Sequence, residues 1–346
     1  MSTVDCLDDP TTGGLVLNDT TISSLNESAS NLVVFCAFVL GIGLFGSIMN
    51  GVVLNILLSK ELRSKASYLL IINQVVLDFL SCLFLLPCYI IKIQTIYLAG
   101  NWGKFVCIVF YSDASVYSLQ AGSITNLVLI AAERYMKIVH VVFHRTYFKR
   151  WMSYLGLIFI WAVVVFINIV FVWTSEVVDG VCDSYYYWPS GPSFVAYGGF
   201  VMVWEFAIPL ILFVYLYGRI LLFVRQRSQA LNESHANQAT ATSLQTSAHR
   251  SQMNITVTMI IVSSTFVLFW LPNQLFYLLT FINSAYNVGV VYYPTVFLIF
   301  LNVCTNPLIY AAKHEEVKSR IRKWFFKTKV QPEVSTTVGT ISSAVS

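Results

Sequence analysis

The chain has 346 residues, of which 57% are hydrophobic and only 11% charged, and its formal net charge is +4. Soluble proteins average about 25% charged residues, so this composition excludes an ordinary soluble domain and favours a protein with several membrane-spanning segments. The sequence offers no nucleophile–base pair and no metal-ligating cluster at catalytic spacing. It therefore predicts neither an enzyme nor a nucleic-acid-binding protein.

Seven long apolar segments follow one another along the chain, and each can cross a bilayer as a helix of about 20 residues. They cover residues 32–59, 68–94, 106–138, 152–174, 194–224, 254–283 and 289–311. All of the 21 Lys and Arg residues except Lys92 and Lys104 fall on one side of the membrane in this arrangement. Basic segments stay in the cytoplasm, so the N-terminus is predicted outside and the C-terminus inside. The sequence thus predicts an all-α membrane protein, a seven-transmembrane helix bundle over residues 32–311.

Residues 1–31 form the predicted extracellular N-terminal segment. They contain neither the basic region nor the apolar run of a cleaved signal peptide, so the first span is expected to direct insertion. Asn18 and Asn26 each begin an Asn-X-Ser/Thr triplet, which is an acceptor for N-glycosylation. We therefore expect this segment to be glycosylated.

The second and third spans carry polar side chains at depths where lipid offers no hydrogen-bond partner. Asp78 lies deep in the second span, where an ionised carboxylate costs at least roughly 2.5–3.5 kcal/mol unless it is paired or neutralised. It is either a protonated, hydrogen-bonded carboxyl or a charged group held by polar partners. Ser123 is one candidate partner, and Asn302 and Asn306 are others, because residues four apart share one face of a helix. The third span contains further amides and hydroxyls, so other helices should surround it.

Most of the spans carry a short motif or a single polar residue or proline at a defined place. These features are, in chain order, Asn50, Asp78, Glu133-Arg134-Tyr135, Pro209 with Tyr217, FVLFWLPN (266–273) and NPLIY (306–310). Each is weak alone, since proline and tryptophan are common in membrane helices. Together, in this order on seven spans, they resemble the rhodopsin-like (class A) G-protein-coupled receptors over roughly residues 32–327.

The resemblance implies a role for each matching residue. A disulfide would join the top of the third helix to the second outer loop through Cys107 and Cys182. An allosteric sodium ion, the only cofactor implied, would be held by Asp78, Ser123, Trp270, Asn302 and Asn306. The activation switch would consist of Ile124, Glu133, Arg134, Tyr135, Pro209, Tyr217, Phe266, Trp270, Pro272 and Tyr310. An outward swing of the sixth helix would open a groove for a heterotrimeric G protein, lined by Arg134, Val142, Tyr217 and Tyr310.

The ligand is constrained mainly by what the sequence lacks. Phe300 stands where a retinal-binding opsin has its lysine, and Val116 or Ala114 stands where an amine receptor has its aspartate. The second outer loop instead combines four aromatic residues (185–188) with acids, which suits a basic peptide by analogy with peptide receptors. We expect a peptide, with a small non-amine ligand as the alternative. The candidate pocket residues are Lys92, Asp113, Tyr117, Gln120, Glu205, Gln274 and Tyr277.

The outer part of the third span has an unusual length. Cys107 and Arg134 are 27 residues apart, two more than in the resembling family. Two extra residues add roughly 3 Å and 200° to a helix, so either the helix starts later or it carries a bulge. The orientations of Asp113 and Tyr117 depend on which of these occurs.

The C-terminal part of the chain divides into two predicted segments. Residues 312–327 place Val317, Ile321 and two aromatic residues on one face against basic neighbours, as in an amphipathic helix at the inner membrane surface, and this matches the family's eighth helix. Residues 328–346 are rich in Ser and Thr and are predicted to be a disordered cytoplasmic tail. The resemblance implies that receptor kinases phosphorylate this tail and that arrestin then binds it.

One rival prediction comes from a different class of protein. Asp78 and Glu205 could form an acid relay in a plasma-membrane transporter or channel. The chain lacks the inverted repeats typical of many transporters, and it carries the switch residues of a receptor. The receptor prediction is therefore favoured.

Overall fold

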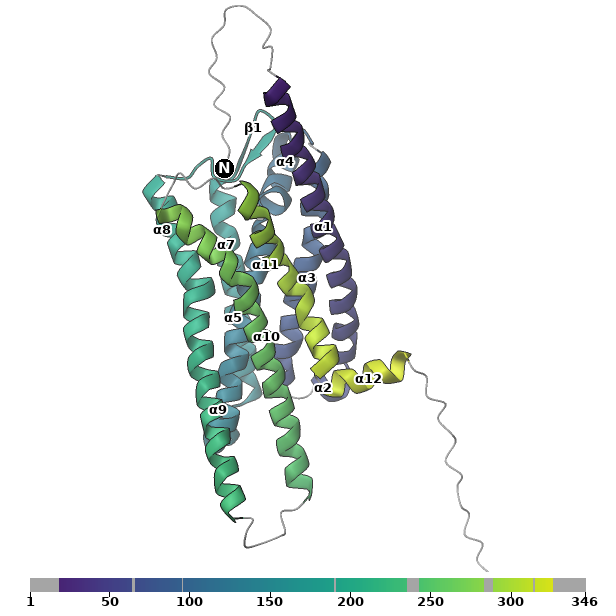
Figure 1. Cartoon of the computed structure of the whole chain (residues 1–346), viewed down its shortest axis with the longest axis vertical. Coiled ribbons are helices and arrows are strands. Elements are labelled where there is room, and N and C mark those ends of the chain that lie inside the picture. Colours follow the sequence, from purple (N-terminus) through teal and green to yellow (C-terminus); the bar gives the residue numbers. More distant parts are fainter. Residues whose placement is uncertain are drawn as a thin grey trace, which may run out of the picture.

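In the computed structural model, the described residues are 19–63, 66–94, 96–189, 191–234, 243–282, 289–313 and 315–325. Within them, seven helical segments are long and apolar enough to cross a membrane. These segments are Ser30–Leu57, Tyr68–Gln94, Gly100–Val139, Arg150–Thr174, Gly191–Arg227, Met253–Thr280 and Val291–Lys313. They pack side by side in one bundle (Figure 1). The predicted seven-helix architecture is confirmed.

The spans are built from helices and short connecting elements. In chain order the elements are α1 (Asp19–Leu57), α2 (Lys60–Arg63), α3 (Ala66–Gln94), α4 (Gly100–Val106), η1 (Cys107–Tyr111), α5 (Ala114–Val139), α6 (Val141–Tyr147), α7 (Arg150–Thr174), β1 (Glu176–Val178), β2 (Val181–Asp183), α8 (Gly191–Met202), η2 (Val203–Ala207), α9 (Ile208–Ser234), α10 (Ser243–Ile282), α11 (Gly289–Lys313) and α12 (Glu315–Phe325). The π-helical turns η1 and η2 interrupt the third and fifth spans, which otherwise continue through α4–α5 and α8–α9.

The third span lies at the centre of the bundle. In its most apolar window 78% of the residues are buried, against 17% in the fourth span, α7, which must therefore face lipid. α5 packs against α3, α7, α9 and α10. At Gly122, a Cβ atom would collide with the Val164 side chain of α7, so the absent side chain permits this close approach. The prediction that other helices surround the third span is confirmed.

Two differences from the predicted architecture follow from local sequence. β1 and β2 form a small antiparallel hairpin in which Val177 pairs with Cys182, so the chain is not purely helical. α1 begins at Asp19 instead of residue 32, because the polar residues before Ser30 can continue the helix beyond the membrane with their backbone groups bonded to one another. Residues 1–18, including Asn18, and the side chain of Asn26 lie outside the described part, so glycosylation stays a prediction.

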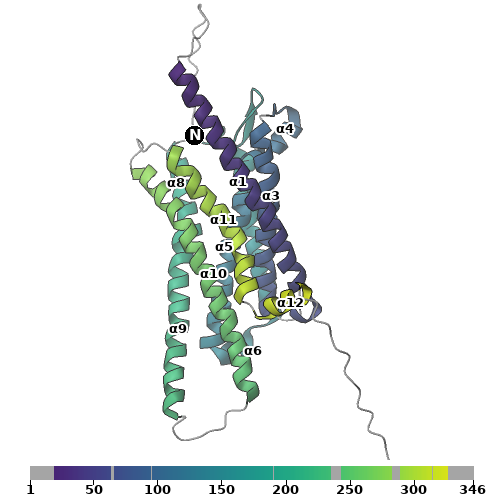
Figure 2. The same ribbon diagram turned by 45° about the vertical axis from the view of Figure 1, so that its right-hand side comes forward.

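A short helix follows the seventh span, as predicted. α12 covers Glu315–Phe325 and runs across the end of the bundle in Figures 1 and 2, while residues 326–346 lie outside the described part. Val317 is buried, and both Val317 and Ile321 pack against the bundle core. Below, the end of the bundle that carries α12 is called the inner end, and the end that carries the β1–β2 hairpin is called the outer end.

Candidate functional site

The hairpin at the outer end is attached to the third span at two points. The predicted disulfide between Cys107 of η1 and Cys182 of β2 is present. In addition, Lys104 Nζ of α4 lies 2.7 Å from Glu176 Oε2 of β1. The hydrogen bond from Lys104 lowers the pKa of the Glu176 carboxyl below its ordinary value. The hairpin is therefore fixed over the outer end beside the third span.

The extra length of the third span is absorbed at η1 and at the residue that follows it. The π-helical turn Cys107–Tyr111 widens the helix, and Asp113 then adopts a left-handed backbone conformation with φ of 57°. α5 restarts at Ala114, and the Ser115 hydroxyl donates to the Val109 carbonyl across the break at 2.8 Å. The span therefore carries the expected bulge, whereas its helix does not start late, because α4 already begins at Gly100.

This break places Asp113 against the second span. Its carboxylate forms an ion pair with Lys92 of α3, and the Lys92 ammonium also lies 4.5 Å from the centre of the Tyr89 ring. The two side chains are only 14% and 19% exposed. Two of the candidate ligand residues are thus bound to each other in this conformation.

The other candidate ligand residues are either more deeply buried in the bundle than Lys92 and Asp113 or exposed near its outer end. Tyr117 packs near Phe300 of α11, with ring centres 6.1 Å apart. Gln120, Glu205 and Gln274 are 2%, 5% and 8% exposed, whereas Tyr277 is 39% exposed. Neither amide atom of Gln120 has a hydrogen-bond partner among the described residues. The structure therefore places three candidate polar groups inside the outer half of the bundle.

Asp78 is the centre of a polar cluster that joins three helices. The Ser123 hydroxyl of α5 donates to Oδ1 at 2.8 Å, and the Asn306 amide of α11 donates to Oδ2 at 2.8 Å. Gln74, one turn earlier on α3, lies 3.4 Å from both carboxylate oxygens and also hydrogen-bonds to Ser123. Asp78 itself is fully buried. The carboxylate therefore connects α3, α5 and α11 in the middle of the membrane.

The predicted sodium ligands fit a small cation only in part. Asn302 and Asn306 each have an amide oxygen without a hydrogen-bond partner among the described residues, and carboxylate and hydroxyl oxygens lie beside them. Oxygen atoms are the ligands that a hard cation prefers. Trp270, however, makes no hydrogen bond to this cluster within the described residues, and its ring centre lies 5.6 Å from that of Phe266. The sodium site stays a prediction, with Trp270 placed in an aromatic stack.

That stack contains the predicted switch residues of the sixth span. Phe266 is fully buried and lies 6.0 Å from Phe213 of α9 and 6.3 Å from Phe206 of η2, measured between ring centres. Ile124 of α5 is buried in the same core. Pro209 is the second residue of α9, which follows η2 directly, and Pro272 lies within α10. The stack thus joins the fifth and sixth spans at mid-membrane.

At the inner end, the arginine of the ERY motif is enclosed. Arg134 is 1% exposed, and its Nε lies 3.0 Å from Glu133 Oε2. The other Glu133 oxygen lies 3.4 Å from His144 Nε2 of α6 and 3.8 Å from Lys137 Nζ. Tyr135 hydrogen-bonds to His140 at 3.1 Å. Glu133 is therefore surrounded by basic groups from α5 and α6.

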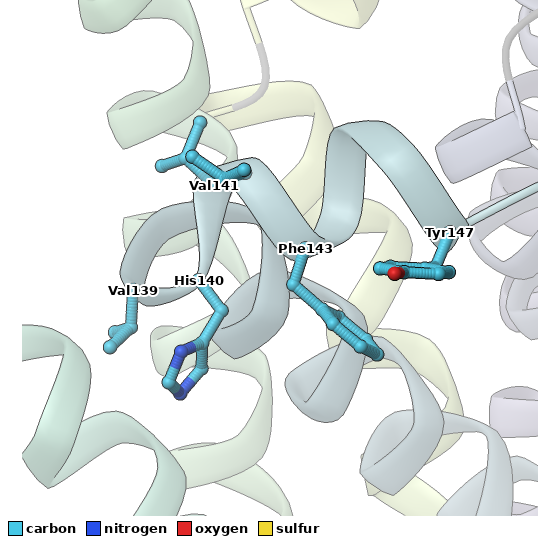
Figure 3. A pocket seen from close by; sticks show the side chains of 6 residues that line it. Val139, His140, Val141, Phe143 and Tyr147 are labelled. Atoms are coloured by element: carbon cyan, nitrogen blue, oxygen red, sulfur yellow. The ribbon is translucent and has the colours of Figure 1, made fainter.

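The residues predicted to contact a G protein are not together on the surface. Arg134, Tyr217 and Tyr310 are buried, and the Tyr217 hydroxyl is bonded to Ser263 of α10 at 3.1 Å. Val142, in contrast, is 80% exposed. It borders a shallow hollow of about 540 Å³ that is lined by residues 139–143 and Tyr147 (Figure 3). In this conformation only the α6 part of the predicted surface is accessible.

Sequence reasoning missed several members of these clusters. Gln74 and Lys137 lie four residues from Asp78 and Glu133, and this helical spacing was a signal that could have identified them. Asn73, which accepts a hydrogen bond from Trp161 at 3.1 Å, and His144 act across different elements. Their contacts depend on the tertiary fold, and no local pattern indicates them.

Comparisons with known proteins agree with this geometry. Residues 49–310 match the family described as "7 transmembrane receptor (rhodopsin family)". The human lysophosphatidic acid receptor 3 is 26% identical over 220 residues, which cover 62% of this chain and 58% of that receptor. The allatostatin-A receptor of Bombyx mori is 26% identical over 325 residues (86% of this chain, 81% of that receptor), and the mouse substance-K receptor 24% over 322 residues (90% and 80%).

The fold also resembles a solved structure. Squid rhodopsin superposes with a TM-score of 0.68 at 19% sequence identity, over 86% of each chain. At this identity the likeness concerns the arrangement of helices alone. The chain thus matches just over half the length of the lysophosphatidic acid receptor and about four-fifths of the length of the allatostatin-A and substance-K receptors.

Proposed function

Because the chain belongs to the rhodopsin family of seven-transmembrane receptors, we propose that it binds an extracellular ligand and activates heterotrimeric G proteins. The observation that carries this proposal is the enclosed Arg134 at the inner end, which Glu133 holds by an ion pair. Lys and Arg lie almost entirely at the same end of the sequence-predicted bundle, and this supports our proposal that the inner end faces the cytoplasm and that the protein lies in the plasma membrane.

The resting arrangement suggests how the inner end opens. Tyr217 of α9 is bonded to Ser263 of α10, and Arg134 is buried among these helices. An outward movement of α10 about the proline-containing segment near Pro272 separates these contacts. Arg134, Tyr217 and Tyr310 then line a groove, and Val142 extends it along α6. A helix of the G-protein α subunit would bind there.

The Asp78 cluster would stabilise the resting arrangement. Asp78, Ser123, Asn302 and Asn306 supply oxygen atoms from α3, α5 and α11, and they are the residues that would hold a sodium ion. Such an ion supplies positive charge beside a carboxylate that is otherwise buried in apolar surroundings. The hydrogen bonds of Ser123 and Asn306 to Asp78 hold the three helices together in this state, and a different packing of the helices would break them.

The outer end favours a positively charged ligand. On the predicted outer side there are ten acidic residues and only two basic ones: Asp5, Asp8, Asp9, Asp19, Glu27, Asp113, Glu176, Asp179, Asp183 and Glu205 against Lys92 and Lys104. Both lysines are already paired with acids. A lysophosphatidic acid carries an anionic phosphate and would need an available cation, whereas a basic peptide is attracted by this charge distribution. We therefore propose a basic peptide ligand.

A screen of cells that express the chain tests both parts of this proposal. We expect at least one member of a panel of basic peptides to raise a second messenger, with acidic peptides of equal length and lysophosphatidic acid inactive. Cells that lack the receptor are the control. A response to lysophosphatidic acid without any peptide response contradicts the ligand class, and ion flux without nucleotide exchange favours the transporter alternative.

The tail, 328–346, is proposed to bind arrestin after phosphorylation by receptor kinases.

A further inference from the structure

The two acids inside the outer half of the bundle differ in one respect. Asp113 has a partner, because Lys92 reaches it from α3. Glu205 is 5% exposed, and among the described residues its carboxylate forms no ion pair, since Lys92 and Lys104 bind other acids. All Arg residues lie at the inner end in sequence, and the only two outer lysines pair with Asp113 and Glu176. Within the described part of the chain, no Lys or Arg side chain is therefore available to Glu205.

Glu205 occupies a specialised place in the fifth span. It is the middle residue of η2, the π-helical turn Val203–Ala207 that precedes Pro209. Such turns insert a residue into a helix and change the direction of the side chains around them. η2 packs against both α5 and α10, so Glu205 lies in the part of the fifth span that faces the interior of the bundle.

Two neighbouring helices contribute further buried polar groups without partners. Gln120 of α5 is 2% exposed, and neither its amide nitrogen nor its amide oxygen is hydrogen-bonded within the described part of the chain. Trp270 of α10 is equally buried, and its indole N–H is also unsatisfied there. The Phe206–Phe266–Trp270 stack places η2 and Trp270 at one level of the bundle.

Unsatisfied groups of this kind are costly. A buried donor or acceptor without a partner costs about 1–3 kcal/mol, and a buried carboxylate costs more. Natural proteins keep few such groups, and those that persist call for a ligand, an ion or water. Gln120, Glu205 and Trp270 come from three spans that contact one another, so a single polar ligand group could satisfy more than one of them.

We propose that Glu205 anchors a positively charged group of the ligand, a guanidinium or a primary ammonium, at mid-depth in the bundle. The Gln120 amide oxygen accepts a second N–H of the same group, which favours a guanidinium with its several donors. This inference rests on the proposed function, because it identifies which acid of the receptor recognises the basic ligand.

The test uses a small cationic probe and the purified full-length chain in detergent. We expect n-butylguanidine to raise the melting temperature of the unaltered protein, and n-butylurea, which is similar in shape but neutral, to have no effect. In Glu205→Gln the half-maximal concentration of n-butylguanidine should rise by at least about tenfold, because the variant keeps the size of the side chain but removes its charge. Glu205→Asp should retain part of the effect.

Glu176→Gln is the matched control, since it removes an outer acid that Lys104 already satisfies. It should bind n-butylguanidine like the unaltered protein. An unchanged half-maximal concentration in Glu205→Gln overturns the inference, as does the absence of any shift in the unaltered protein. Loss of the shift in Asp113→Asn instead would place the cation at the outer pair and also overturn it. Because melting needs no G protein, missing nucleotide exchange with intact probe binding would contradict only the proposed function.

Discussion

Asp78→Leu is expected to destabilise the protein by about 3–5 kcal/mol, because it removes the shared acceptor of several buried donors and each unsatisfied donor costs about 1–3 kcal/mol. The Ser123 hydroxyl and the amides of Gln74 and Asn306 all converge on the Asp78 carboxylate. Leucine accepts no hydrogen bond, so all three donors lose the carboxylate, and only Gln74 keeps another acceptor, the Ser123 hydroxyl. The melting temperature of the detergent-solubilised protein measures this loss.

Two variants at the same depth separate this effect from general damage to α3. Asp78→Asn keeps the size of the side chain and one acceptor, so its melting temperature should fall between those of Asp78→Leu and the unaltered protein. The hydroxyl of Ser81 is buried and has no partner among the described residues, so Ser81→Ala should change stability little. If Asp78→Leu melted no earlier than Ser81→Ala, the proposed role of the cluster in holding the helices would be wrong.

Cys182→Ser should destabilise the protein by about 2–4 kcal/mol and reduce the amount that reaches the cell surface, because the disulfide closes a loop of 75 residues. The effect should arise at the outer end, where the β1–β2 hairpin would then be held chiefly by Lys104 and Glu176. Surface labelling and the melting temperature together measure it.

Cys107→Ser and the double variant provide the internal check on this prediction. Because either single change breaks the same bond, all three variants should lose equal stability. Additive losses in the double variant would show that the two cysteines act independently. Cys36→Ala is a further control, since Cys36 is a free, buried cysteine of α1 and its removal breaks no crosslink.

Much of the fold could be predicted because the membrane restricts the chain so strongly. Only a continuous helix satisfies its own backbone in lipid, so each long apolar run gives a span. The partners of Asp78 could be anticipated for a related reason, since a buried carboxylate must meet polar side chains and few are present at that depth. The hydropathy of the spans and the free-energy cost of a buried carboxylate thus indicated Ser123 and Asn306 as partners of Asp78.

The contacts that could not be predicted depend on local backbone geometry. The π-helical turn η1 and the left-handed Asp113 rotate the start of α5, and this rotation brings Asp113 to Lys92. Nothing in the side-chain pattern of residues 107–113 distinguishes this turn from a regular helix. The β1–β2 hairpin was missed because strands of three residues give no measurable alternation. His144 meets Glu133 only after α6 folds back beside α5.

Arg134, buried at the inner end, is proposed to become the contact through which the receptor acts on a G protein. Guanine-nucleotide exchange on purified G proteins, measured with the receptor reconstituted in lipid vesicles, tests it most directly. The unaltered receptor should accelerate exchange on at least one G-protein class, and Arg134→Ala, matched for the amount of folded protein, should not. Equal nucleotide exchange with the unaltered receptor and with Arg134→Ala would contradict this role of Arg134. So would the absence of exchange on every G-protein class by the unaltered receptor in the presence of the peptides that are active in cells.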